Sequence, residues 1–201
     1  MTGRTGGRDV ERRGVERRGA GGKAAGGKAA GGRPADPEAA ARELCLRLLS
    51  ASPRTRAQLA DALRRKDVPD EVADRVLSRF TDAGLIDDEA FARSWVQSRH
   101  TGRGLARRAL AAELRRRGVA DETVSDAVDS LDPAQEERTA RALIDRRLRA
   151  TRDLDPVKRT RRLIGLLARK GYSPALSYRV VNEALAEEGV TLEDLPEPPP
   201  D

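Results

Sequence analysis

One short pattern occurs three times in this chain and limits what the chain can fold into. A leucine is followed by a basic cluster, a turn with one apolar residue, and the start of a further helix. The copies span residues 63–70, 114–121 and 167–174, so the pattern recurs after 51 and then 53 residues. Recurrence at a nearly constant period is the sequence signature of a repeat protein. We therefore expect three copies of one structural unit.

The apolar residues around these copies recur at helical spacing. Ala40, Leu44 and Leu48 stand four residues apart, and similar stripes continue through the later segments. Aromatic residues make up only 2% of the chain, whereas strands favour aromatic and β-branched side chains. The sequence predicts an all-α fold of three tandem three-helix repeats, over residues 38–86, 87–132 and 133–189. Each repeat has few large apolar side chains for its core, so we expect an elongated array.

The two ends of the chain differ from these repeats in composition. Residues 1–37 are rich in Gly, Arg and Ala, and residues 190–201 are acidic and rich in proline. Neither segment has the apolar periodicity that would offset its ordering entropy, so we expect two disordered tails. The net charge is +6, and the first tail contributes most of it, with nine Arg and Lys against four Asp and Glu. Basic surface on the repeats is therefore expected to be local.

The sequence offers little for catalysis. It contains one histidine, His100, and one cysteine, Cys45, with no third partner at catalytic spacing. We expect His100 to cap a helix or face solvent, and Cys45 to be a small buried hydrophobic residue. The acidic run at 87–89 is interpreted as a helix start, with Asp87 or Asp88 as N-cap, rather than as a metal site. We predict no enzyme, no catalytic residues, no metal and no cofactor.

Neither a membrane span nor a signal peptide is expected. The chain has no run of about 18 apolar residues, which a spanning helix needs. Its N-terminal stretch lacks the apolar core of a secretory signal. We expect a cytoplasmic monomer.

The densest set of candidate binding residues surrounds a glycine turn at residues 101–104. Gly102 and Gly104 are expected to end a helix there and to let the backbone approach a partner closely. Arginines beside such a turn favour an acidic or phosphate-bearing partner. Phe91 and Trp95 lie four residues apart on one helical face, so core packing is preferred to stacking on bases. The candidate partner-binding residues are Arg99, Arg103, Arg107, Arg108, Arg115, Arg116, Arg117, Lys158, Arg159, Arg161 and Arg162, and the expected core residues are Phe91, Trp95, Leu110 and Leu114.

The middle unit carries a specific set of motifs. They are Leu-Ile-Asp-Asp-Glu-Ala-Phe-Ala at 85–92, Ser-Arg at 98–99, Gly-Arg-Gly at 102–104, Arg-Arg at 107–108 and Glu-Leu-Arg-Arg-Arg-Gly-Val at 113–119. In these motifs the chain resembles the RecX family, bacterial regulators of the RecA recombinase. A weaker match, Lys-Gly-Tyr-Ser at 170–173, lies in the third unit, and the resemblance covers about residues 38–189.

The resemblance implies three tandem three-helix repeats with a curved, basic concave surface. It also implies binding in the groove of RecA filaments on single-stranded DNA. Inhibition of ATP hydrolysis, strand exchange and the co-protease activity that triggers the SOS response would follow, and so would regulation of homologous recombination and DNA repair. Single-stranded or duplex DNA stays open as a further partner of the basic patches. The alternative is a helix-turn-helix-like DNA-binding protein that acts without RecA, because two short helices around a glycine turn suit that motif.

Overall fold

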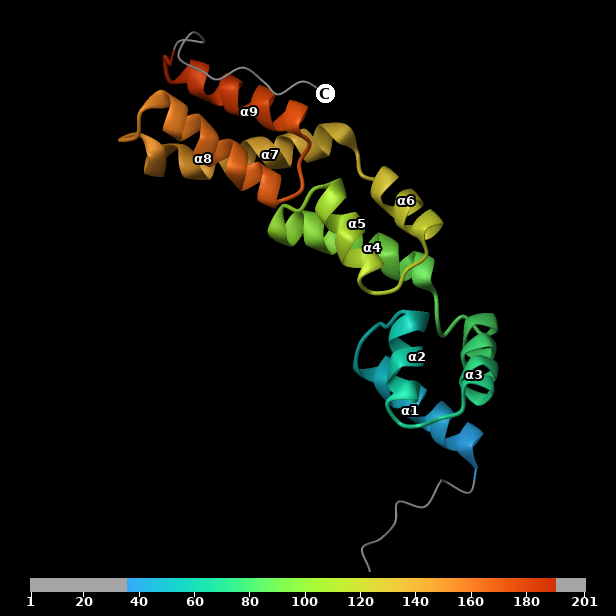
Figure 1. Ribbon diagram of the computed structural model, residues 1–201. Helices are drawn as coiled ribbons and strands as arrows, with labels where there is room; N and C mark the ends of the chain where they lie inside the picture. The colour runs from blue at the N-terminus through green and yellow to red at the C-terminus, as the bar shows by residue number, and fades with distance from the viewer. Residues whose placement is uncertain (1–35, 191–201) are drawn as a thin grey trace, which may run out of the picture. The chain divides into compact units, whose positions relative to one another are not determined.

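The computed structural model describes residues 36–190, and this part of the chain is all-helical (Figure 1). The described part contains nine α-helices, one short 3₁₀ helix and no strand, so the predicted all-α fold of three three-helix units is confirmed. Residues 1–35 and 191–201, which make up nearly all of the two predicted disordered tails, lie outside the described part, whereas Asp36 and Pro37 form the start of α1. The elements are α1 (Pro37–Ala51), α2 (Arg56–Arg64), α3 (Asp70–Asp82), α4 (Asp88–Arg103), α5 (Arg107–Arg115), α6 (Asp121–Asp129), α7 (Pro133–Leu148), η1 (Arg149–Thr151), α8 (Pro156–Arg169) and α9 (Pro174–Glu187).

Each group of three helices encloses its own hydrophobic core. We call α1–α3 repeat 1, α4–α6 repeat 2 and α7–α9 repeat 3 (Figure 1). The second helix of each repeat supplies two buried leucines four residues apart, the spacing of one helical face. Burial of each such side chain contributes about 1.5–3 kcal/mol. These pairs are Leu59 and Leu63 in α2, Leu110 and Leu114 in α5, and Leu163 and Leu167 in α8, which confirms the core positions expected for Leu110 and Leu114.

The corner between the second and third helices has the same backbone in all three repeats. Its apolar residue donates its N–H to the carbonyl of the last leucine of the second helix, at 3.2–3.3 Å. The residue before it lies in the left-handed region, a conformation that helps to satisfy the carbonyls at a helix end. The sequence repeat is therefore also a repeat of hydrogen bonds. The donors are Val68, Val119 and Tyr172, and the left-handed residues are Asp67 (φ 55°), Gly118 (φ 75°) and Gly171 (φ 87°).

Repeat 1 is joined to repeat 2 through the N-terminus of α2. The Thr55 hydroxyl donates to the carbonyl of Arg117 at 2.6 Å, and the Arg56 N–H donates to the Asp88 carboxylate at 2.9 Å. Both acceptors belong to repeat 2. A helix N-terminus has N–H groups without partners in the helix and a partial positive charge, so Asp88 of repeat 2 supplies an acceptor that α2 lacks.

The junction between repeats 2 and 3 uses the equivalent residues, although a backbone N–H replaces the Thr55 hydroxyl. The Ala106 N–H donates to the Lys170 carbonyl at 2.9 Å, and the Arg107 N–H donates to the Glu136 carboxylate at 3.1 Å. Tyr172, buried in the same corner, donates its hydroxyl to the Gly104 carbonyl at 3.2 Å. Burial, with Glu136 adding to the effect, raises the pKa of this phenol, so the hydroxyl keeps the proton that it donates. One recurring set of polar contacts therefore joins the three repeats.

Two of the corners have glycine because the neighbouring repeat leaves no room for a side chain. A Cβ atom on Gly118 would lie 2.3 Å from the Ala57 Cβ, and one on Gly171 would lie 2.5 Å from the Ala109 nitrogen. Within the described part no repeat precedes repeat 1, and its corner residue is Asp67, which carries a side chain at positive φ. Packing between repeats, in addition to backbone conformation, therefore requires these two glycines.

The prediction of a glycine turn at residues 101–104 is wrong in one respect. Helix α4 continues through Arg103, so Gly102 lies inside the helix, and Gly104 alone, at φ 61°, ends it. Gly104 also lies against repeat 3, because a Cβ atom on it would be 3.0 Å from a methyl group of Leu143. Gly104 therefore belongs to a junction between repeats rather than to a turn that is open to a partner.

The prediction that His100 caps a helix or faces solvent is also wrong. Its side chain lies in the same junction and the residue is only 3% exposed. The Nδ1 atom lies 2.9 Å from the Leu105 carbonyl, to which it donates, and the Nε2 atom lies 2.9 Å from the Thr139 hydroxyl in α7. His100 is therefore an internal polar contact between repeats 2 and 3.

Two other local expectations, the Asp87 cap and the burial of Cys45, are confirmed. Asp87 caps α4, because its carboxylate accepts the Ala90 N–H at 2.7 Å. Cys45 is a free thiol that is fully buried in the core of repeat 1, and this burial raises its pKa. No helix between residues 36 and 190 is both long enough and apolar enough to cross a membrane.

The junction glycines allow a direct test. Gly118→Ala combines positive φ with a clash against Ala57, whereas Gly84→Ala has the same strain at φ 70° with no atom within 4 Å of the new methyl group. Left-handed strain costs about 1–2 kcal/mol, and overpacking adds about 1–3 kcal/mol. We expect urea unfolding to give the larger loss of stability for Gly118→Ala. Equal losses for the two variants would contradict the tight junction.

Candidate functional site

The candidate binding residues separate into three groups once their contacts are known. Two arginines make internal contacts, two lie against the Trp95 ring, and the others are exposed. The internal pair is Arg107 and Arg159, the pair at Trp95 is Arg99 and Arg117, and the exposed residues are Arg103, Arg108, Arg115, Arg116, Lys158, Arg161 and Arg162.

Arg107 holds repeats 2 and 3 together. Its guanidinium donates to the Leu131 carbonyl, and its Nε atom lies 3.7 Å from the Glu136 carboxylate. The same carboxylate accepts the backbone N–H of Arg107 at the start of α5. These contacts occupy the side chain, so Arg107 leaves the set of residues that we assign to partner binding.

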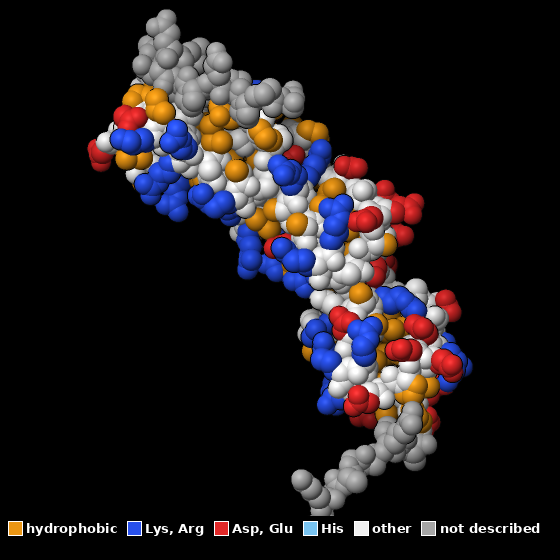
Figure 2. Space-filling view, in the orientation of Figure 1, with side chains coloured by type: hydrophobic (Ala, Val, Ile, Leu, Met, Phe, Trp, Pro, Cys, Tyr) orange, Lys and Arg blue, Asp and Glu red, His pale blue; other side chains and the backbone are white. Residues whose placement is uncertain are grey.

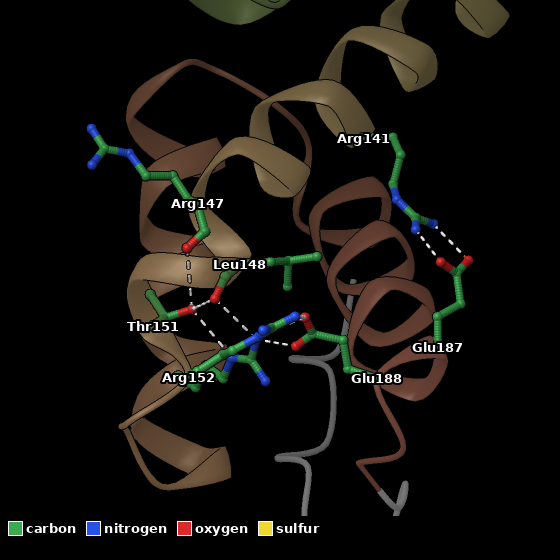
Figure 3. A network of polar contacts seen from close by, with 8 residues as sticks. Arg141, Arg147, Leu148, Thr151, Arg152, Glu187 and Glu188 are labelled. Carbon is green, nitrogen blue, oxygen red and sulfur yellow. Dashed lines mark hydrogen bonds and ion pairs between the residues drawn. The ribbon is translucent and has the colours of Figure 1, made fainter.

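Arg159 is buried in repeat 3, although it was expected in an exposed basic run. Its Nε donates to the Thr151 hydroxyl at 3.2 Å, and its Nη2 donates to the Leu148 carbonyl at 3.1 Å and pairs with Glu188. Glu188 also pairs with Arg152 at 3.1 Å, as Figure 3 shows. The hydrogen bond from Arg159 is the main reason that the pKa of Glu188 is lowered, and the hydrogen bond from Arg152 lowers it further. Arg159 therefore stabilises the fold and is removed from the binding set.

Trp95 is the centre of a second polar network. Its indole Nε1 donates to the Glu113 carboxylate at 2.8 Å, and the guanidinium carbons of Arg117 and Arg99 lie 3.7 Å and 4.1 Å from the centre of its ring. Phe91 stacks on Trp95 with ring centres 5.7 Å apart. Both rings pack against the core of repeat 2 but stay partly exposed, so their assignment to the core is only half right.

A compact basic surface surrounds the C-terminal end of α8. Arg103, Arg146 and Lys170 line a cavity of about 350 Å³, and Arg147, Arg162 and Arg169 line a second of about 170 Å³. Arg169 also lines a third cavity, of about 620 Å³, together with Arg108. Within residues 36–190 none of these cations forms an ion pair. We call this set the α8 basic cluster: Arg103, Arg108, Arg146, Arg147, Arg162, Arg169 and Lys170.

Sequence reasoning found only part of this cluster. It identified Arg103, Arg108 and Arg162 from their dense local runs and placed Arg169 and Lys170 in the recurring basic cluster, but it did not name these two as binding residues and it missed the cations of α7. The pair Arg146 and Arg147, in the last turn of α7, was a usable signal, because cations gather at helix C-termini. The remaining exposed candidates are less distinctive, since Arg115 and Lys158 pair with nearby aspartates at the surface.

Opposite charges occupy different parts of the surface. In Figure 2, Lys and Arg side chains gather over α8 and the adjoining ends of α4 and α5, whereas Asp and Glu side chains gather over α6. Helix α6 carries four acidic residues and no basic residue. In the described chain no group of three His, Cys, Asp or Glu side chains is arranged to hold a metal ion. The arrangement therefore suits binding of an anionic surface.

Comparison with known proteins identifies the family. The models of the first, second and third three-helix domains of RecX match residues 41–80, 87–128 and 135–181, in that order. The regulatory protein RecX of Thermobifida fusca is 61% identical over 163 residues, which cover 81% of this chain and 88% of that protein. This chain belongs to the RecX family. The regulatory protein RecX of Streptomyces lividans is likewise 61% identical, over 80% of this chain and 85% of that protein.

Solved RecX structures have the same fold. The crystal structure of RecX from Lactobacillus salivarius superimposes with a TM-score of 0.70 at 21% identity, and covers 76% of this chain and 99% of that one. A second regulatory protein RecX gives a TM-score of 0.67 at 26% identity, with 74% and 73% covered. The RecX family consists of regulatory proteins, so this member has a regulatory role.

The buried arginine of repeat 3 generates a stability prediction. Glu188→Gln leaves the buried Arg159 guanidinium without its carboxylate, and we expect a loss of about 2 kcal/mol at neutral pH, because hydrogen bonds to charged groups contribute about 1.5–3 kcal/mol. Since its folded-state pKa is lowered, the carboxylate stabilises the protein above its unfolded-state pKa. That stabilisation is lost as the pH falls through the lowered folded-state pKa.

Urea unfolding between pH 7 and pH 3 measures this effect. The difference between wild type and Glu188→Gln should shrink as the pH falls. Glu187→Gln is the matched control, because Glu187 pairs with Arg141 at an exposed site, where ion pairs contribute little. A control that loses as much stability as Glu188→Gln would contradict the structural role of the buried pair.

Proposed function

We propose that this protein binds RecA filaments on single-stranded DNA and inhibits their ATP hydrolysis, strand exchange and co-protease activity. It would thereby regulate DNA repair and the SOS response. The observation that carries the proposal is the α8 basic cluster on a RecX-family scaffold, with seven cations that have no carboxylate partner in the described chain. Arginine forms strong bidentate contacts with carboxylates and phosphates, so a filament of an acidic protein on DNA is a fitting partner.

The mechanism follows from the way in which the repeats are joined. The recurring junction contacts hold three helical units in one chain, so contacts made by one unit restrict where the next can bind. A chain that binds adjacent RecA protomers in this way resists the movements between protomers that accompany ATP turnover. Charge complementarity also speeds the encounter with the filament and makes it sensitive to salt.

The alternative, a helix-turn-helix DNA-binding protein that acts without RecA, is less well supported. In that motif a recognition helix enters the major groove between two rows of phosphates. The helix that follows residues 101–104 is α5, and its first residue, Arg107, is held in the junction with repeat 3 by Leu131 and Glu136. The other short helix of this repeat, α6, carries Asp121, Glu122, Asp126 and Asp129 and no cation. Its charge would repel the phosphates. The basic cluster can still contact single-stranded DNA as part of a filament complex.

Charge reversal tests the proposal. The triple variant Arg108→Glu, Arg162→Glu, Arg169→Glu changes three exposed members of the α8 basic cluster. We expect at least about a tenfold rise in the concentration that half-inhibits single-strand-dependent ATP hydrolysis by RecA, because tenfold corresponds to only about 1.4 kcal/mol. The matched control reverses three exposed arginines outside the cluster, Arg42, Arg47 and Arg138. Circular dichroism checks that both variants stay helical.

Two outcomes contradict the proposal. If the cluster variant and the control inhibit equally well, the α8 basic cluster does not contact the filament. If wild type leaves RecA activity unchanged and binds naked duplex DNA tightly, the independent DNA-binding function is the better account.

A further inference from the structure

A cavity of about 600 Å³ lies between repeats 1 and 2, and no member of the α8 basic cluster lines it. Its apolar lining includes the stacked Phe91 and Trp95 rings together with Leu49 and Leu85. Leu85 is 49% exposed, an unusual state for a large apolar side chain in this structure. Binding pockets typically have volumes of roughly 300–1,000 Å³, apolar walls and a few polar groups, so this cavity has the size and chemistry of a binding site.

Two arginines among the polar residues that line this pocket lack an acidic partner. Within the described chain, the Nε atom of Arg54 is buried without a hydrogen-bond partner, and Arg117 forms no ion pair. Burial lowers the pKa of Arg117. The negative charge of Glu113 opposes this lowering, and the positive charges of Arg99 and Arg116 add to it, as expected for a cation that is poorly neutralised.

The acidic residue in the lining does not supply the missing charge. Asp87 caps α4 by accepting the N–H of Ala90, and within the described chain it forms no ion pair with Arg54 or Arg117. A buried donor without a partner costs about 1–3 kcal/mol, so a carboxylate that entered the pocket would gain from both arginines.

We propose that this pocket receives a protein segment in which one large apolar side chain stands next to an Asp or Glu. The apolar side chain packs against Phe91 and Trp95, and the carboxylate pairs with Arg54 and Arg117. The segment belongs to a RecA protomer of the filament, so this inference rests on the proposed function. The pocket thereby adds an anchor in repeats 1 and 2 to the charge contacts that the α8 basic cluster makes.

Stacking of a nucleic-acid base on Trp95 is the competing use of this pocket. Two guanidinium groups and the Phe91 ring already lie against the indole, and the indole N–H is bonded to Glu113. A base would have to displace one of these contacts. The exposed apolar surface of Leu85 also gives no advantage to a phosphate-bearing ligand. A protein segment therefore fits better than a base.

A pair of substitutions on α4 tests the pocket. Ser94 and Gln97 are both exposed, but only Ser94 lines the cavity. Ser94→Glu places a carboxylate at the pocket, where it pairs with the arginines and excludes the segment, and Gln97→Glu adds the same charge outside it. We expect Ser94→Glu to weaken binding to RecA filaments on single-stranded DNA by about tenfold or more, as loss of a central anchor does. Gln97→Glu should change binding less than about twofold, because surface charges contribute little.

Fluorescence anisotropy of the labelled protein measures filament binding, and the same assay with naked single-stranded DNA provides the second readout. We expect equal affinities of the two variants for naked DNA. Equal filament binding by Ser94→Glu and Gln97→Glu overturns the pocket while the proposed function stands. A parallel loss of naked DNA binding by Ser94→Glu identifies a nucleic-acid site and also overturns it. Absence of filament binding by wild type overturns both proposals.

Arg54→Met gives an independent check. It removes the buried guanidinium but keeps a long apolar side chain at the pocket. We expect weaker filament binding with unchanged thermal unfolding, because the Arg54 Nε has no hydrogen-bond partner in the described structure to lose. Undiminished filament affinity would overturn the role of Arg54 in binding a carboxylate.

Discussion

The array of repeats depends on how the second helix of each repeat begins. At the starts of α2 and α5, the first N–H group of the helix donates to a carboxylate of the following repeat, Asp88 or Glu136. A corner carbonyl of that repeat also accepts a hydrogen bond from the N-cap residue, through the Thr55 hydroxyl at α2 and the Ala106 N–H at α5. Ala106 has no side chain that could cap α5, so this helix relies on repeat 3. A buried N–H without an acceptor costs about 1–3 kcal/mol, so the stability of one repeat is coupled to the docking of the next.

The same junctions decide which cations can reach a partner. Arg107 begins α5 and contacts Leu131 and Glu136, and Arg159 occupies a core position in repeat 3. The cations of the α8 basic cluster instead stand mostly near the ends of α4, α7 and α8. Positive charge there stabilises helix C-termini and leaves an excess for an anionic partner. One set of residues therefore serves both stability and the proposed binding of a filament.

Most of the fold could be predicted from spacing alone. The leucine pairs of each second helix, the corner that follows them and the Asp87 cap all depend on residues within about one or two helical turns. The motifs between residues 85 and 119 pointed to the RecX family, which the family models and the relatives confirm. The sequence also contained a signal for Arg159 that the density of basic residues obscured, since it stands at the same helical spacing as Leu163 and Leu167.

The candidate site was less predictable, because its members come from separate helices. Arg146, Arg169 and Lys170 approach Arg103 and Arg108 only through the docking of repeat 3 on repeat 2. The sequence by itself determined the helices, the corners and the family, since these rest on neighbouring residues. Only the tertiary structure decided which glycines, which histidine and which arginines are internal. Their burial and hydrogen bonds depend on residues such as Glu136 and Gly104, which lie 29 and 68 positions from their bonding partners along the chain.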